Sequence, residues 1–179
     1  MSVFKTDEGN ENSLDWKILR DGGIALYRNQ DFLSEDTNWL RSNGYKVVTF
    51  DCADWLSSRD MHESLKHALS FPSYYGHNLD ALDECMQEDI QVPDSGGLVL
   101  VLEHYDQYSR GPGSTHTSQR CEAEVVLDIF ALAGRHHLLF GRRLITIVQS
   151  DDPGIQFERL GCVSARWNSR EWLNKSRGM

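Results

Sequence analysis

The stretch LVLVLEHY, residues 98–105, begins with five consecutive leucine and valine residues. Successive side chains of a strand point to opposite faces of a sheet, so a strand formed by this run would be apolar on both faces. An uninterrupted apolar sequence of this kind is typical of parallel sheets, which are covered on both faces. The run therefore predicts a buried strand over 98–105 and favours an α/β fold.

Segments with strand and helix patterns alternate on either side of this run. Short apolar runs and β-branched or aromatic content predict three further strands, over residues 22–28, 45–52 and 144–150. Apolar residues at helical spacing predict helices over 31–42, from Ser58 to Pro72, over 79–89 and over 122–136. Four strands separated by helices indicate a small parallel sheet with right-handed crossovers and flanking helices.

The length of 179 residues fits one domain with a sizeable core. Residues 1–15 have the composition of a loose leader, and residues 16–44 fit an added N-terminal βα unit. Glycine, serine and threonine in residues 109–120 indicate a flexible surface loop. Residues 151–179 then form a C-terminal extension of mildly basic character.

The negative charge of the chain is concentrated in one interval. The formal net charge is -9, and there is no lysine or arginine between Lys66 and Arg110. That interval holds eight carboxylates: Asp80, Asp83, Glu84, Glu88, Asp89, Asp94, Glu103 and Asp106. Contacts to phosphate need lysine and arginine, so we expect no nucleic-acid partner. An acidic surface favours a basic protein partner and speeds the encounter with it.

Neither a membrane segment nor a disulfide framework is indicated. No apolar run approaches the roughly 20 residues of a membrane-spanning helix, and the N-terminus is acidic and polar, unlike a signal peptide. The four cysteines are far apart and form no CxxC pair, which favours free thiols over disulfides or a zinc site. We therefore expect a cytoplasmic protein without a membrane partner.

The stretch YYGHNLDALDECM, residues 74–86, combines a short loop with the start of the predicted helix 79–89. Asn78 is a candidate N-cap for this helix. The apolar positions fall on one helical face: Leu79, Leu82, Cys85 and Met86. Three carboxylates at i, i+3 and i+4 can share another, exposed sector: Asp80, Asp83 and Glu84.

Three interpretations of these carboxylates are open. Acid/base catalysis would need burial that separates their pKa values, and nothing in the pattern indicates burial. Acidic residues in a first turn also stabilise a helix through its dipole, so the cluster could be a plain solvated face. The third interpretation is a surface that binds a basic partner, with Tyr74, close to Gly76, as an exposed aromatic beside the carboxylates.

Motifs of other chemistries are absent from the sequence. It contains no HExxH, EF-hand, GxSxG, Walker A or GxGxxG pattern. Cys85 lies on the apolar helical face, where a thiol is inert. His136 and His137 are adjacent and so point to different sides of a helix, which prevents them from chelating a metal together. We expect no enzyme activity, no metal and no cofactor.

The segment DMHESLKHALSFPSYYGHNLDALDECM, residues 60–86, resembles the barstar family of intracellular ribonuclease inhibitors. The resemblance is densest in YYGHNLDAL and continues, with insertions, through LVLVLE, AEVVLDIFALA and LITIVQS. It implies a barstar-like α/β fold without catalysis. Residues 16–150 are then a barstar-like domain, with a core over 45–150 and the added N-terminal unit before it.

In that family the matching helix and the loop before it block a ribonuclease active site, with carboxylates in place of RNA phosphates. Carried over to this chain, the expected partner-binding residues are Tyr74, Gly76, Asn78, Asp80, Asp83 and Glu84. Glu84 is one methylene longer than the matching family aspartate, and Asp83 replaces an aromatic interface residue.

The resemblance thus implies an immunity protein that inhibits a basic ribonuclease, barnase-like or other, which is extracellular or delivered into the cell. A regulatory module that binds a different basic protein through the same acidic helix is the alternative. Recovery of a ribonuclease, rather than a regulator, in a pulldown would separate the two hypotheses.

Overall fold

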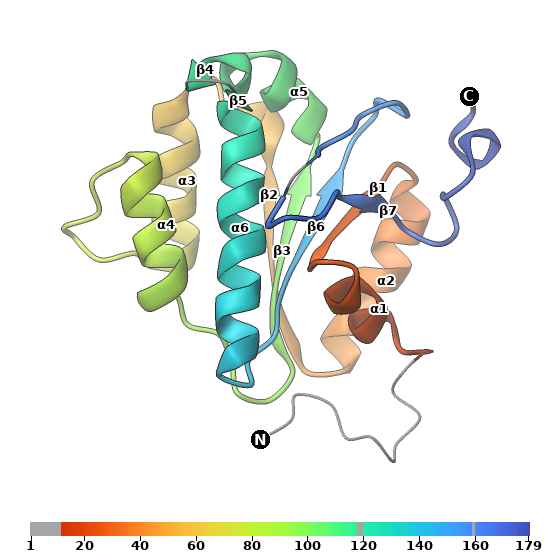
Figure 1. Ribbon diagram of the computed structural model, residues 1–179, viewed down its shortest axis with the longest axis horizontal. Coiled ribbons are helices and arrows are strands. Elements are labelled where there is room, and N and C mark those ends of the chain that lie inside the picture. The colour runs from red at the N-terminus through yellow and green to blue at the C-terminus, as the bar shows by residue number, and fades with distance from the viewer. Residues whose placement is uncertain (1–11, 118–119, 159) are drawn as a thin grey trace.

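The computed structural model describes residues 12–117, 120–158 and 160–179. Its centre is a five-stranded parallel sheet with the strand order β2-β3-β6-β1-β7 (Figure 1). The strands are β1 (Ile24–Tyr27), β2 (Tyr45–Asp51), β3 (Gly97–Glu103), β6 (Leu144–Gln149) and β7 (Arg166–Trp167). A separate antiparallel pair joins β4 (His116–Thr117) and β5 (Arg120–Cys121). The predicted α/β class and its parallel sheet are confirmed.

Strand β3 lies between β2 and β6 and is buried on both faces, as its apolar run predicts. Leu98, Leu100 and Leu102 belong to one buried cluster. Val99 and Val101, which point the other way, belong to a second buried cluster. The alternation of this strand between two cores shows why residues 98–102 of β3 contain no polar side chain.

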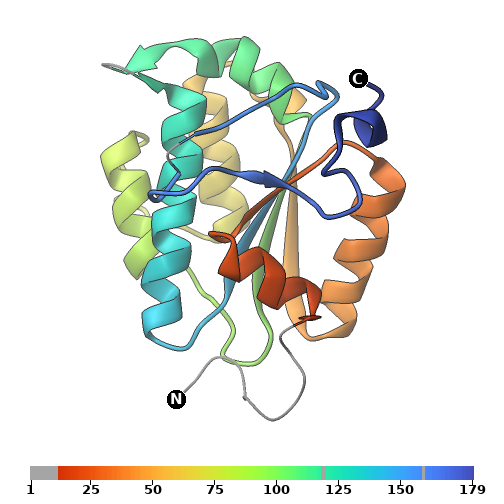
Figure 2. The same cartoon turned by 45° about the vertical axis from the view of Figure 1, so that its right-hand side comes forward.

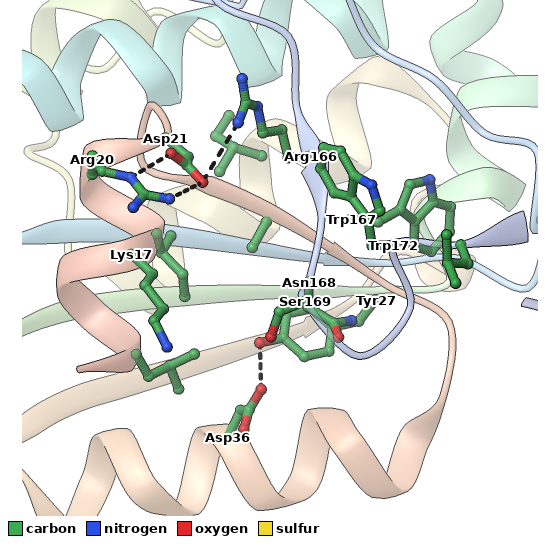
Figure 3. A pocket seen from close by; sticks show the side chains of 15 residues that line it. Lys17, Arg20, Asp21, Tyr27, Asp36, Arg166, Trp167, Asn168, Ser169 and Trp172 are labelled. Atoms are coloured by element: carbon green, nitrogen blue, oxygen red, sulfur yellow. Dashed lines mark hydrogen bonds and ion pairs between the residues drawn. The ribbon is translucent and has the colours of Figure 1, made fainter. Parts of the chain in front are cut away.

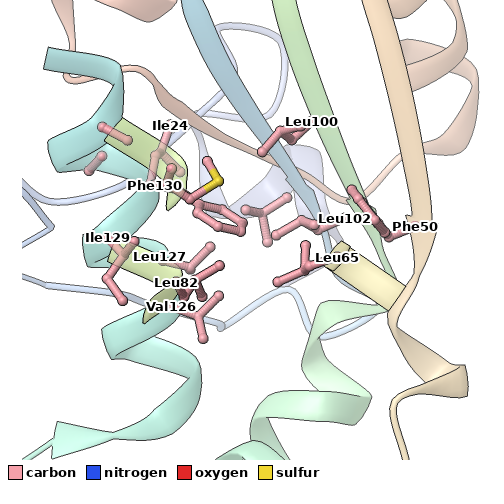
Figure 4. Packing of buried hydrophobic residues seen from close by; sticks show 14 of the residues in the cluster. Ile24, Phe50, Leu65, Leu82, Leu100, Leu102, Val126, Leu127, Ile129 and Phe130 are labelled. Carbon is pink, nitrogen blue, oxygen red and sulfur yellow. The ribbon is translucent and has the colours of Figure 1, made fainter. Parts of the chain in front are cut away.

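Helices cover both faces of the sheet. Figures 1 and 2 show α3 (Ser58–Leu69), α4 (Leu79–Glu88) and α6 (Glu122–Leu139) on one face. The other face carries α1 (Leu14–Arg20) and α2 (Gln30–Ser42). In Figure 4, Leu65 of α3, Leu82 of α4 and Phe130 of α6 lie in the same apolar layer. Burial of this layer fixes α4 against α6 and leaves its opposite side outward.

The predicted strand over 98–105 is wrong at its end. Strand β3 stops before Tyr105, and α5 (Tyr105–Arg110) begins there. Tyr105 and Tyr108 are three residues apart, so a helix places both on one side, where they pack edge-on against Trp55. The ring centroids lie 6.4 and 5.2 Å from that of Trp55. Packing against Trp55 thus favours helix over continued strand.

Part of the predicted flexible loop over 109–120 has regular structure. It contains the end of α5, the short helix η3 (Pro112–Ser114) and β4, while residues 118 and 119 lie outside the described ranges. Two other single-turn helices are η2 (Cys52–Asp54) and η4 (Asn174–Arg177). None of the helices in the described ranges is long and apolar enough to cross a membrane.

Both ends of the chain contribute to the central sheet. Strand β1 pairs with β6 on one side and with β7 on the other, with Ala25 opposite Arg166 and Leu26 opposite Trp167. Neither β7 in the C-terminal extension nor α1, which begins at the end of the predicted leader, is indicated by the sequence patterns. Residues 1–11 of that leader lie outside the described ranges.

Candidate functional site

Helix α4 begins where the sequence predicts, and its apolar face points inward. The side-chain oxygen of Asn78 accepts a hydrogen bond from the backbone N–H of Ala81 at 2.8 Å, which caps the first turn. Leu82, Cys85 and Met86 are fully buried between α4 and the core. The predicted N-cap and the inward positions are therefore confirmed, and Leu79, the remaining predicted member, packs against the same cluster while partly exposed.

The outer side of α4 carries a row of exposed carboxylates. Asp80, Glu84 and Glu88 recur every four residues, and each is exposed. At a rise of about 1.5 Å per residue, successive members of this row lie about 6 Å apart along the helix axis. Asp83 differs from them, because it is half-buried and accepts a hydrogen bond from the side-chain amide of Gln87 at 2.8 Å. We call Asp80, Glu84 and Glu88 the acidic row.

No cation of the described chain neutralises this row. The ion pairs found within the described ranges do not involve any carboxylate of α4. The last turn of α4 also lacks a basic residue and ends on Glu88, where the helix dipole disfavours negative charge. Asp80, in the first turn, sits at the favourable end. The row therefore projects a negative field that the protein itself does not compensate.

The loop before α4 is fixed by one of its two adjacent tyrosines. Tyr75 is 3% exposed, and its ring lies between those of Phe71 and His77, with centroid separations of 5.0 and 5.1 Å. Its hydroxyl is hydrogen-bonded to Nδ1 of His62, a buried residue of α3. Burial raises the pKa of the Tyr75 hydroxyl, so the group stays protonated. No local sequence pattern indicates this contact between Tyr75 and His62, which lie 13 residues apart.

Tyr74, in contrast, is 69% exposed. Its hydroxyl donates to both carboxylate oxygens of Asp89 at 2.9 Å, and this hydrogen bond raises the pKa of Tyr74 to about 12. The contact brings the start of the loop to the C-terminal end of α4. Because 15 residues separate the partners, no sequence spacing indicates the contact. The predicted exposure of Tyr74 is confirmed, and Asp89 is its unpredicted support.

The remaining loop residues shape the approach to the first turn of α4. Gly76 and Asn78 are exposed, and the Asn78 amide donates to the carbonyl of Gly76 at 3.4 Å. A methyl group on Gly76 would lie 3.1 Å from that amide nitrogen, which is closer than ordinary contact. His77 between them has a left-handed backbone (φ 51°), and its Nε2 lies 3.2 Å from a carboxylate oxygen of Glu63. These contacts set the direction in which the chain enters α4.

The geometry of this surface suits binding rather than chemistry. The acidic row is exposed on the side of a helix, and no residue of α4 lines the cavity of about 540 Å³ that the protein contains elsewhere. Within the described ranges, no three histidine, cysteine, aspartate or glutamate side chains gather as metal ligands. Exposed carboxylates held on a rigid helix can accept hydrogen bonds and form ion pairs with arginine or lysine of another protein.

Two comparisons with known proteins bear on this surface. A 61-residue part of the chain is 37% identical to a protein of Bacillus subtilis (strain 168) named "Putative ribonuclease inhibitor YrdF". That match covers 34% of this chain and 63% of the relative, so the chain spans less than two thirds of the relative's length. Residues 45–148, more than half of the chain, match the family described as "Barstar (barnase inhibitor)". These residues include α4 and the loop before it, and the chain therefore belongs to the barstar family.

Proposed function

We propose that this protein inhibits a basic ribonuclease by binding to its active site and blocking it. The observation that carries the proposal is the acidic row of α4, which is exposed and has no cation from the described chain beside it. The family match and the name of the B. subtilis relative support the ribonuclease as the class of partner.

The acidic row would act as a mimic of RNA phosphates. A ribonuclease binds the phosphates of its substrate largely through arginine and lysine. These side chains can donate to carboxylate oxygens in the same geometry. Asp80 and Glu84 take the central positions in this proposal. Glu88 and Asp83 add negative charge that steers a basic partner toward the surface. Because α4 is packed in place before binding, little conformational entropy is lost by its backbone.

The loop before α4 would form the rim of the same interface. Tyr74 offers an exposed ring that packs against the partner, as tyrosines commonly do at interfaces. Gly76 leaves room for close backbone approach, and Asn78 holds the first turn. The proposed partner is a ribonuclease that is secreted or delivered by another cell, with this protein as the immunity factor of the cell that contains it.

The decisive experiment measures inhibition of basic microbial ribonucleases, barnase among them, by the wild-type protein and by Asp80→Lys/Glu84→Lys. Wild-type protein should inhibit at least one of them stoichiometrically. The double reversal should weaken binding by more than about a hundredfold, since close charge pairs across the barnase–barstar interface are coupled by about 1.5 to 7 kcal/mol.

The matched control is Asp31→Lys/Glu158→Lys, which changes the net charge equally at two exposed carboxylates outside α4. It should reduce binding by less than about tenfold, through weaker long-range attraction alone. Equal losses in the two double variants would show that net charge, rather than the acidic row, determines binding. Absence of inhibition, combined with recovery of a non-nuclease basic protein by the wild-type chain, would instead favour a regulatory module.

A further inference from the structure

A cavity of about 540 Å³ lies beside β7, on the side of the sheet that carries α1 and α2 (Figure 3). Its walls come from α1, β1, α2 and residues 166–173, so the two ends of the chain build it together. Its volume falls within the range of about 300 to 1,000 Å³ that is usual for small-molecule sites. No lining residue belongs to α3, α4 or α6, which separates this cavity from the acidic row.

The cavity has an apolar wall and an aromatic wall. Ile18 and Ala25, both buried in the core under α1 and α2, form part of the apolar wall. Trp167 and Trp172 lie together across the cavity from α1 (Figure 3). Trp172 remains 57% exposed although it lines the cavity, so much of its ring surface is available for contact.

The chain holds Trp172 in place through its polar neighbours. Glu171 is 1% exposed and accepts hydrogen bonds from the backbone N–H groups of Arg28 at 3.0 Å and Asn29 at 2.9 Å. The buried guanidinium of Arg177 donates to the carbonyls of Glu171 and Trp172 at 2.6 and 3.0 Å. Hydrogen bonds of Glu171 and Arg177, rather than burial of the Trp172 ring, hold this segment in place. The ring therefore stays exposed at the cavity.

Most charged groups that line the cavity already have partners. Asp21 is shared by Arg20 and Arg166, at nitrogen–oxygen distances of 2.8 and 3.8 Å. Asp36 is paired with Arg170, which does not line the cavity, at 2.7 Å, and it also accepts a hydrogen bond from the Tyr27 hydroxyl. Arg170 is also paired with Glu35, so Asp36 shares its partner, and both carboxylates of the cavity are engaged in ion pairs.

Lys17 is the cation of the cavity lining that has no ion-pair partner among the described residues. It lines the cavity from α1, is exposed, and takes part in none of the ion pairs within the described ranges. Three cations (Lys17, Arg20 and Arg166) and two carboxylates (Asp21 and Asp36) line the cavity, which leaves its lining with one excess positive charge. The cavity thus carries positive charge in a protein whose formal net charge is -9.

We propose that this cavity binds a small planar aromatic anion, with its ring against Trp172 and its anionic group at Lys17. Stacking on an exposed tryptophan favours a flat ring, and the uncompensated ammonium favours an anion over a neutral molecule. The apolar wall under α1 excludes water from the rest of the ligand. The site lies apart from α4, so the ligand and a protein partner on α4 can be bound together.

The test is a fluorescence and calorimetric titration of the full chain with anilinonaphthalene sulfonate, an aromatic anion with a planar naphthalene ring. Phenylnaphthylamine supplies a similar ring system without the charge. The sulfonate should bind saturably with one molecule per chain and at least tenfold more tightly than the amine. Trp172→Ala should weaken sulfonate binding about tenfold, and Trp172→Phe should restore most of it. Lys17→Gln should remove most of the preference for the anion.

Two matched controls replace the same residue types outside the cavity. Trp39→Ala and Lys46→Gln alter exposed residues that do not line it, and both variants should bind the sulfonate as the wild type does. Circular dichroism establishes that each variant is folded, and ribonuclease inhibition should be unchanged by Trp172→Ala. Absence of saturable binding would overturn the proposal. Equal losses in the control variants, or an anion preference that survives Lys17→Gln, would also overturn it.

Discussion

The carboxylates of α4 and those at the contact between α2 and the C-terminal segment are used in opposite ways. In α4, Asp80, Glu84 and Glu88 face outward and meet no cation of the described chain. At the second contact, Glu35 is paired with Arg170, and buried Glu171 accepts two backbone hydrogen bonds. The same functional group therefore holds the fold together in one region and remains available to a partner in the other.

This difference follows from where each carboxylate lies. When a buried carboxylate is removed, the N–H groups that donate to it lose their partner. The loss is costly because water cannot reach these groups to take its place. An exposed carboxylate is solvated whether or not it has a partner, so its removal changes stability little. Stability and binding should consequently depend on different acidic residues of this chain.

The same nearly isosteric substitution, Glu→Gln, can be made at a buried glutamate, at an exposed ion pair and in the acidic row. The three variants test whether stability depends on the first position and not on the last. Glu171→Gln should lower the free energy of unfolding by about 2 to 4 kcal/mol, because the amide N–H₂ would face one of the two backbone donors, Arg28 or Asn29, whichever way it is turned. Glu35→Gln, at an exposed ion pair, should cost less than about 1 kcal/mol. Glu84→Gln should leave stability within about 0.5 kcal/mol. Urea unfolding measures all three.

Inhibition assays complete this test, since Glu84→Gln should weaken ribonuclease binding while Glu35→Gln should not. If Glu84→Gln destabilised the fold as much as Glu171→Gln, the division between structural and available carboxylates would be wrong.

A smaller effect is expected at the start of α4. Asn78→Ala removes the side-chain acceptor that caps the helix through the Ala81 N–H, and it should cost about 1 kcal/mol of stability. Asn78→Ser keeps a capping oxygen and should cost less. Thermal unfolding compares the two variants. Identical losses for alanine and serine would mean that the Asn78 side chain acts through its contact with Gly76 instead.

The smallest change is expected on mild acidification. Burial lowers the pKa of His62, under the loop before α4, and that of His137, whose Nε2 is hydrogen-bonded to the carbonyl of Met86. Both groups bind protons less readily in the folded chain, so their contribution is complete above the unfolded pKa of about 6.5 and is lost as the pH falls. Unfolding free energy should therefore decline from about pH 7 to about pH 5.

A third histidine provides the contrast for this pH dependence. The hydrogen bond to Asp51 raises the pKa of His104, so its contribution is present at low pH and is lost as the pH rises through the folded pKa. Asp51→Asn should therefore steepen the decline on acidification. A stability profile that stays flat between these pH values in Asp51→Asn, where the opposing contribution is removed, would contradict the assignments of His62 and His137.

The sequence predicts the parts of this fold that depend on local patterns. The alternating cores of β3, the Asn78 cap and the inward face of α4 follow from residue spacing, and each is found in the structure. Strand β7 has only two residues and depends on pairing with β1, which is far away in the sequence. The start of helix α5 is not predicted, because Tyr105 follows the apolar run of β3 closely and has the aromatic character of a strand residue.

In the candidate site, too, the sequence predicts some features, and others depend on tertiary contacts. The resemblance to the barstar family gives its residues, and helical periodicity gives the row formed by Asp80 and Glu84. Its supports, the contact of Tyr74 with Asp89 and that of Tyr75 with His62, join segments that no local rule connects. The half-burial of Asp83, caused by the packing around α4 and its bond to Gln87, also depends on tertiary structure.

The pairing of β1 has a consequence for the order in which the chain folds during synthesis. Ile24 of β1 pairs with Thr146 of β6, so β1 emerges from the ribosome long before its first partner exists. Strands β2 and β3 are neighbours in both sequence and sheet and can pair earlier. β1 must wait for β6 and then for β7 on its other side. Among the five strands of this sheet, β1 is therefore synthesised first and is one of the last to be paired.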